Sequence, residues 1–83
     1  MRLNTIQDNI NDQIRAAIQT ALPSADVLVS GSNGHFTLEV THEDFKGKSP
    51  VAQQRLVLSA IKHLMAGDAA PVHAVDSLKV HAR

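Results

Sequence analysis

The sequence predicts an α+β fold in which two helices cover one face of a three-stranded mixed sheet. Two segments repeat apolar residues at intervals of three and four, as amphipathic helices do. Three shorter segments are rich in β-branched residues or alternate apolar with polar ones, as strands do. Their order is helix, strand, strand, helix, strand. Because the last helix connects two strands, its crossover should be right-handed and make those strands parallel neighbours.

Residues 4–22 are predicted to form the first helix. Isoleucines recur every four residues on one stripe, at Ile6, Ile10, Ile14 and Ile18. Asn4 or Thr5 can cap its start, and Pro23 should end it. The same stripe could serve as a coiled-coil seam, but a single short helix favours packing within its own domain.

A β-hairpin is predicted next, with strands at residues 26–30 and 35–41. The second strand alternates, with its apolar positions at Phe36, Leu38 and Val40. The connecting residues 31–34, Gly-Ser-Asn-Gly, tolerate the positive φ angles that a tight reversal requires. A GxxG loop also clamps the nucleic-acid backbone in KH domains, where it joins two helices. Here it joins two strands, so we interpret it as a turn.

The second helix is expected to follow a polar connector, residues 42–48, whose one apolar anchor is Phe45. Ser49 is a suitable N-cap, Pro50 suits the first helical position, and Gly67 can adopt the left-handed conformation that ends a helix. The apolar face of this helix is predicted to consist of Val57, Leu58, Ile61, Leu64 and Met65.

Residues 72–80 are predicted to form the third strand, with an irregularity. Val75 lies in one alternation frame, whereas Leu78 and Val80 lie in the other. A β-bulge at Asp76–Ser77 would bring all three apolar side chains to the same face of the sheet.

Length and composition limit the function classes. The 83 residues predict one small domain spanning 1–83. There is no cysteine, so the chain alone can build no thiolate metal site. Eight basic and eight acidic residues balance, and the pI is near 7.0, which argues against a general nucleic-acid binder. We see no signal peptide or membrane-spanning run, and therefore expect a cytoplasmic protein.

Residues that could carry chemistry are few. The sequence shows no Ser–His–acid pattern, no pair of catalytic carboxylates and no phosphate-binding loop, so it gives no positive indication of an enzyme. None of the five histidines forms an HxxxH pair, and His42 and His63 are most simply solvated. His73 begins the third strand, where a strand-end histidine bonded to a carbonyl is the simplest interpretation. The basic residues around the second helix form either a solvated face or a modest patch for a nucleic acid or acidic partner: Lys46, Lys48, Arg55 and Lys62.

Three motifs in register resemble the BolA-like protein family. Phe45-x-Gly47 followed by QQRLV at 53–57 resembles its FxG…RHRLV pattern. PVHAV at 71–75 resembles its VHAL segment, and His35-Phe36 resembles the SHF or THF that opens its second strand. Gln-Gln in place of Arg-His is more similar to the IbaG-type branch. The segment after VHAV has one residue more than is usual, and the chain ends at Arg83 where members commonly continue into a further helix. Many members carry a cysteine or histidine in the loop between the first two strands; this loop lacks cysteine, so only His35 at its edge is a candidate.

The resemblance implies a KH-like fold and a non-enzymatic partner of monothiol glutaredoxins. Members of the family share a [2Fe–2S] cluster with such a glutaredoxin, whose cysteine and bound glutathione hold one side while family histidines help hold the other. By carry-over, His73 is the expected cluster ligand and His35 a weaker second, and the isolated chain is expected to hold no cofactor. Roles in iron–sulfur cluster trafficking or iron regulation, and in the stress response, would follow.

The resemblance also supplies an alternative, a KH-like nucleic-acid-binding regulator of transcription. The neutral charge and the position of the GxxG turn weigh against it. We expect at most weak, salt-sensitive DNA binding through the four basic residues, with dissociation constants of roughly 10⁻⁴–10⁻⁶ M. No membrane and no small-molecule substrate is expected as a partner.

Overall fold

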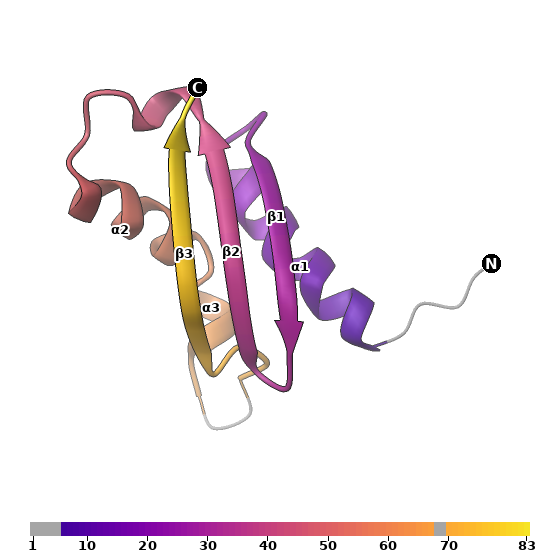
Figure 1. The fold of residues 1–83 in the computed structure, drawn as a ribbon. Helices are drawn as coiled ribbons and strands as arrows, with labels where there is room; N and C mark the ends of the chain where they lie inside the picture. Colours follow the sequence, from indigo (N-terminus) through magenta and orange to yellow (C-terminus); the bar gives the residue numbers. More distant parts are fainter. Residues whose placement is uncertain (1–5, 68–69) are drawn as a thin grey trace.

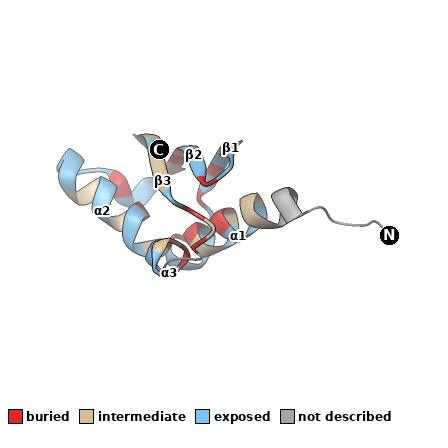
Figure 2. Cartoon of the chain, turned by 90° about the horizontal axis from the view of Figure 1, so that it is seen from below, coloured by how far each residue is buried: buried red, intermediate tan, exposed pale blue. Residues whose placement is uncertain are grey.

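The computed structural model describes residues 6–67 and 70–83 and confirms the predicted α+β fold. The elements in order are α1 (Ile6–Ala21), β1 (Asp26–Ser32), β2 (His35–His42), the 3-10 helix η1 (Glu43–Phe45), α2 (Pro50–Ala60), α3 (Lys62–Met65) and β3 (Ala74–Ala82). The sheet has the order β1-β2-β3 (Figure 1). The helices all lie on one side of it, which leaves its other face uncovered (Figure 2).

The sheet is mixed, as predicted. β1 and β2 are antiparallel, and Asn33 and Gly34 form the two-residue connection, with φ angles of 56° and 82°. Two consecutive positive φ angles are typical of a type I′ hairpin, which suits the twist of the strands. β3 runs parallel to β2. The register shifts between Phe36, which pairs with Val75, and Thr37, which pairs with Ser77, so the predicted bulge is confirmed.

The core lies between the helices and the sheet. The largest fully buried side chains come from every layer: Phe45, Ile14, Ile18, Leu38, Ile61, Val40, Val57 and Val72. Val75, Leu78 and Val80 all pack against this cluster, so the bulge has the predicted effect on β3. The predicted caps Asn4 and Thr5 lie outside the described residues, as does the side chain of Ile6. No helix in the described ranges is both long and apolar enough to cross a bilayer.

The second helix begins as predicted but does not run unbroken to Gly67. The Ser49 hydroxyl accepts a hydrogen bond from the Ala52 N–H at 3.2 Å, and Pro50 occupies the first turn. Ile61, with φ −110° and ψ 10°, leaves the helical conformation and separates α2 from α3. This break keeps Ile61 fully buried while α3 places Leu64 in the core. Gly67 has the expected positive φ, 89°, but follows the helix end by two residues.

The prediction that Leu58 faces the core is wrong. Its side chain is 37% exposed, whereas Val57, Ile61 and Leu64 are buried. At 100° per residue, Leu58 lies about 100° from the stripe formed by Val57, Ile61 and Leu64, on the flank of the helix that faces solvent. Leu56, on the other flank, packs against the core instead.

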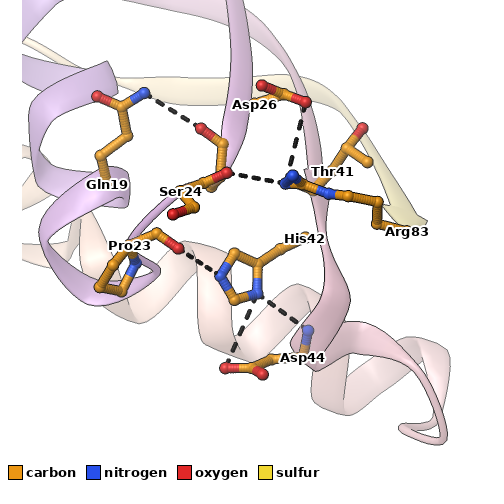
Figure 3. Close-up of polar contacts among 9 residues, drawn as sticks. Gln19, Pro23, Ser24, Asp26, Thr41, His42, Asp44 and Arg83 are labelled. Carbon is orange, nitrogen blue, oxygen red and sulfur yellow. Dashed lines mark hydrogen bonds and ion pairs between the residues drawn. The ribbon is translucent and has the colours of Figure 1, made fainter.

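The connector after β2 is more ordered than its polar composition suggests. His42, expected to be solvated, is 3% exposed. Its Nδ1 accepts the Asp44 N–H at 3.0 Å and so caps η1, which leaves the ring proton on Nε2 to donate to the Pro23 carbonyl at 2.7 Å (Figure 3). His42 thus satisfies a helix end and the turn after α1 together, and η1 places Phe45 in the core.

Arg83 connects the end of β3 to the turn after α1 and the end of β2, close to His42. Its guanidinium donates to the carbonyl oxygens of Ser24, at 2.8 Å, and Thr41, at 3.2 Å (Figure 3). Ser24 has a positive φ of 72°, and this bond holds its carbonyl in place. The chain after α1, the end of β2 and the end of β3 are therefore tied together.

Candidate functional site

The hairpin turn and the start of β3 meet at one end of the sheet. The Gly34 carbonyl accepts hydrogen bonds from the N–H groups of His73, at 2.8 Å, and Ala74, at 2.9 Å. Ala74 is also the partner of His35 in the parallel ladder. The structure therefore brings the two predicted ligand-bearing residues, His35 and His73, to the same end of the sheet. We call His35, His73 and the neighbouring Asp76 the sheet-end site.

The sequence predicts His73 within the third strand, at its start, but β3 begins at Ala74, so His73 lies immediately before it. Its side chain is exposed. The expected bond to a carbonyl is made by its backbone N–H. Within residues 6–67 and 70–83, its ring makes no hydrogen bond. The ring instead packs over Gly34: a Cβ built on that glycine would approach its Cγ and Nδ1 to 2.7 Å. His73 is thus positioned by packing, and neither ring nitrogen is engaged by another residue of the described ranges.

Gly34→Ala should displace the His73 ring. Position 34 has φ +82°, a conformation costing roughly 1–2 kcal/mol for a residue with a Cβ, and the new methyl group would occupy the place of the ring. We expect a modest loss of stability, measured by urea unfolding, with large chemical-shift changes for the His73 ring in NMR spectra.

Gly47→Ala is the matched control, because Gly47 has φ +83° but nothing lies within 4 Å of the place that a Cβ would take. It should lose similar stability without moving the His73 resonances. Unchanged His73 ring shifts in Gly34→Ala would contradict the packing of the ring over Gly34.

His35, unlike His73, has a side-chain partner among the residues that the structure describes. Its Nδ1 lies 3.2 Å from Asp76 Oδ1, and both side chains are more than half exposed. Asp76 is the residue left without a partner on β2 by the bulge, and it can therefore reach His35. A carboxylate on one ring nitrogen orients an imidazole and leaves the other nitrogen outward. Sequence reasoning found the bulge but not this contact.

The sheet-end site suits a metal centre that is completed by another molecule. Neutral imidazole nitrogen binds iron, and metal-bound histidines usually have a carboxylate or carbonyl behind the ring, as His35 has in Asp76. The described residues contain no group of three or more histidine, acidic or cysteine side chains placed to hold a metal ion. The donor set therefore fits a shared cluster ligand, and it does not form a full coordination sphere in this part of the chain.

The other histidines are engaged elsewhere. His42 is buried, and both of its ring nitrogens form hydrogen bonds. His81, near the end of β3, lies 2.7 Å from Glu39 through Nε2. His63 is exposed, as predicted, and lines a groove between α1 and α3 together with small side chains such as Ala17 and Ala60. None of these three belongs to the sheet-end site.

The four basic residues are all exposed, and three of them lie along one surface. Lys48 and Arg55 line one open groove beside α2, and Arg55 and Lys62 line the next. Lys46 lies in the turn before α2 and lines neither groove. The GxxG turn at residues 31–34 connects β1 and β2 at the sheet-end site. In KH domains the corresponding loop connects two helices, so the turn here is not in the position of a KH nucleic-acid clamp.

Comparisons with known proteins agree with this fold. Residues 6–82 match the family described as BolA-like protein. A protein of the rpoN-murA intergenic region of Acinetobacter guillouiae is 35% identical over 65 residues, which cover 78% of this chain and 76% of that protein. A bolA protein homologue from Coxiella burnetii superposes with a TM-score of 0.70 and 30% identity, over 96% of this chain and 92% of that one.

A third similar structure is yeast Fra2, with a TM-score of 0.65 and 26% identity over 87% of this chain and 77% of that one. The order of elements, the mixed sheet and the motif positions at residues 35, 45 and 73 are those expected from the family resemblance. Assignment to the IbaG-type branch stays a prediction. The chain belongs to the BolA-like protein family.

Proposed function

We propose that this protein is a binding partner of a monothiol glutaredoxin and shares a [2Fe–2S] cluster with it, with His73 as the ligand from this chain. The observation that carries the proposal is the exposed His73 ring, which is positioned by Gly34 and makes no hydrogen bond in the described part of the chain. Membership of the BolA-like family supports the choice of partner.

The composition requires that sulfur come from outside this chain. With no cysteine, it offers only nitrogen and oxygen donors, whereas the glutaredoxin cysteine and glutathione would supply thiolates. Replacing thiolate by imidazole raises the reduction potential of a cluster, so the shared form should be easier to reduce than an all-thiolate one. The role is one of binding, in cluster trafficking or iron regulation, and involves no catalytic step.

His35 is proposed as a weaker second ligand. Its Nδ1 faces Asp76, so only Nε2 is free to bind. Asp76 would orient the ring, as carboxylates do behind metal-bound histidines. Metal and proton compete for the same nitrogen, so the shared complex should weaken in acid.

The direct test is to add the purified protein to a cluster-loaded monothiol glutaredoxin with glutathione and to record visible absorption and circular dichroism. We expect the spectrum to change from that of the glutaredoxin homodimer to a new one that saturates at equal amounts of the two proteins. An unchanged spectrum at excess of this protein would refute cluster sharing.

A further inference from the structure

Charge is divided unequally along this neutral chain. Residues 46–67 hold four of the eight Lys and Arg residues and none of the eight Asp and Glu residues. This segment, which contains α2 and α3, therefore carries a formal charge of +4, and the rest of the chain carries −4. Such a surface attracts acidic partners and repels basic ones although the protein has no net charge.

Exposed apolar side chains lie among these basic residues. The described part of the chain has three exposed large hydrophobic residues, and two of them, Val51 at 59% and Leu58 at 37%, belong to α2. Leu58 and the half-buried Met65 line an open groove of about 440 Å³ together with Arg55 and Lys62. This groove continues from α2 to α3 across the break at Ile61.

The spacing of these residues places them along one face of α2 and α3. The apolar residues Val51, Leu58 and Met65 recur every seven residues, and the basic residues Arg55 and Lys62, between them, are also seven apart. We call these five residues the outer α2–α3 face. Residues seven apart lie close to one line along a helix. An apolar line with charges beside it is a surface on which a second helix can pack, and the charges would select the partner. The core uses a different stripe, Val57, Ile61 and Leu64. Of the outer face, Val51 and Leu58 are exposed, whereas the half-buried Met65 also packs against the core.

The chemistry of this face favours a protein over a nucleic acid. Exposed aliphatic side chains between the charges would gain nothing from contact with phosphates, whereas they can be buried against another apolar stripe. Single-stranded nucleic acids are held by aromatic stacking, and the only two aromatic residues, Phe36 and Phe45, are buried.

We propose that the outer α2–α3 face binds an acidic amphipathic helix of a partner protein. The apolar side of that helix would cover Leu58 and Met65, and carboxylates on its flanks would pair with Arg55 and Lys62. The grooves along this face include neither His35 nor His73, so this surface lies apart from the sheet-end site. The inference goes beyond cluster sharing and can fail or succeed without it.

The test uses a synthetic helical peptide with leucines at heptad positions a and d and glutamates elsewhere, titrated into the ¹⁵N-labelled full chain. We expect shifts concentrated in residues 48–66 and a dissociation constant below about 1 mM. A peptide of the same composition with a scrambled order, and a single-stranded DNA oligonucleotide, should bind more weakly, because neither presents an apolar stripe.

Variants separate this proposal from non-specific attraction. Leu58→Ser should weaken peptide binding by about tenfold, as loss of a buried leucine contact predicts, and Lys62→Glu should also weaken it. The matched controls are Leu28→Ser and Lys79→Glu, which alter an exposed leucine and a lysine on the sheet, away from this face; they should leave it unchanged.

Three outcomes would overturn the inference: tighter binding of DNA than of the peptide, equal affinity for the scrambled peptide, or no effect of Leu58→Ser. Association of the protein with itself through this face, seen by sedimentation and abolished by Leu58→Ser, would identify a second copy as the occupant instead. Leu58→Ser should retain the cluster spectrum with glutaredoxin, so loss of peptide binding and loss of cluster sharing are distinguishable.

Discussion

The His73→Ala protein should remain folded and should lose the visible spectrum of the cluster shared with a monothiol glutaredoxin. The ring is exposed and belongs to no part of the core, so its removal should change the free energy of unfolding by less than about 1 kcal/mol. Its loss removes the iron ligand that this chain is proposed to supply. No neighbouring cysteine can replace it, because the chain has none.

The measurement is a titration of cluster-loaded glutaredoxin, followed by visible circular dichroism, with far-ultraviolet dichroism to confirm the fold. His81→Ala is the matched control, because His81 is an exposed histidine of β3 paired with Glu39 rather than placed at the sheet-end site. His35→Ala should reduce the signal less than His73→Ala does. A normal shared-cluster spectrum from His73→Ala would show that the ligand assignment is wrong.

Phe45→Ala should cause the largest loss of stability of any substitution proposed for this protein. Phe45 is fully buried, and its ring packs edge-on against the buried His42 ring, with centroids 6.1 Å apart. Truncating a buried phenylalanine typically costs about 3–5 kcal/mol. Domains of this kind are stable by only about 5–15 kcal/mol, so this one side chain carries a large share of the total.

Urea unfolding followed by circular dichroism would measure this effect. Leu28→Ala serves as the control, since Leu28 is 65% exposed on the uncovered face of the sheet and should change stability by no more than about 0.5 kcal/mol. Similar midpoints for the two variants would contradict the burial of Phe45 and the role of η1 in holding it.

Much of the fold could be predicted from local patterns. Three such patterns each act over a few residues: the isoleucine stripe, the Ser49-Pro50 helix start and the alternation after His35. The structure confirms the helix start, the alternation and the stripe from Ile10 to Ile18. The bulge could also be predicted, because a shift of the apolar residues from one alternation frame to the other within a strand indicates one inserted residue.

What could not be predicted depends on contacts between distant segments. The burial of His42 requires the Pro23 carbonyl, nineteen residues away, to meet its ring, and no local pattern indicates this. The break at Ile61 and the exposure of Leu58 depend on how α2 and α3 fit the sheet. Both candidate histidines could be named from motifs, but the His35–Asp76 contact follows from a bulge geometry that only the folded sheet reveals.

The bulge also bears on how this sheet end can change during evolution. Asp76 lies between Val75 and Ser77, which pair with successive residues of β2, so a lineage could gain or lose this one residue and keep the pairing on either side. Insertion there leaves the core unchanged and adds a carboxylate beside an exposed histidine. Relatives that differ by this single residue should therefore share a core while differing in whether a carboxylate orients this histidine.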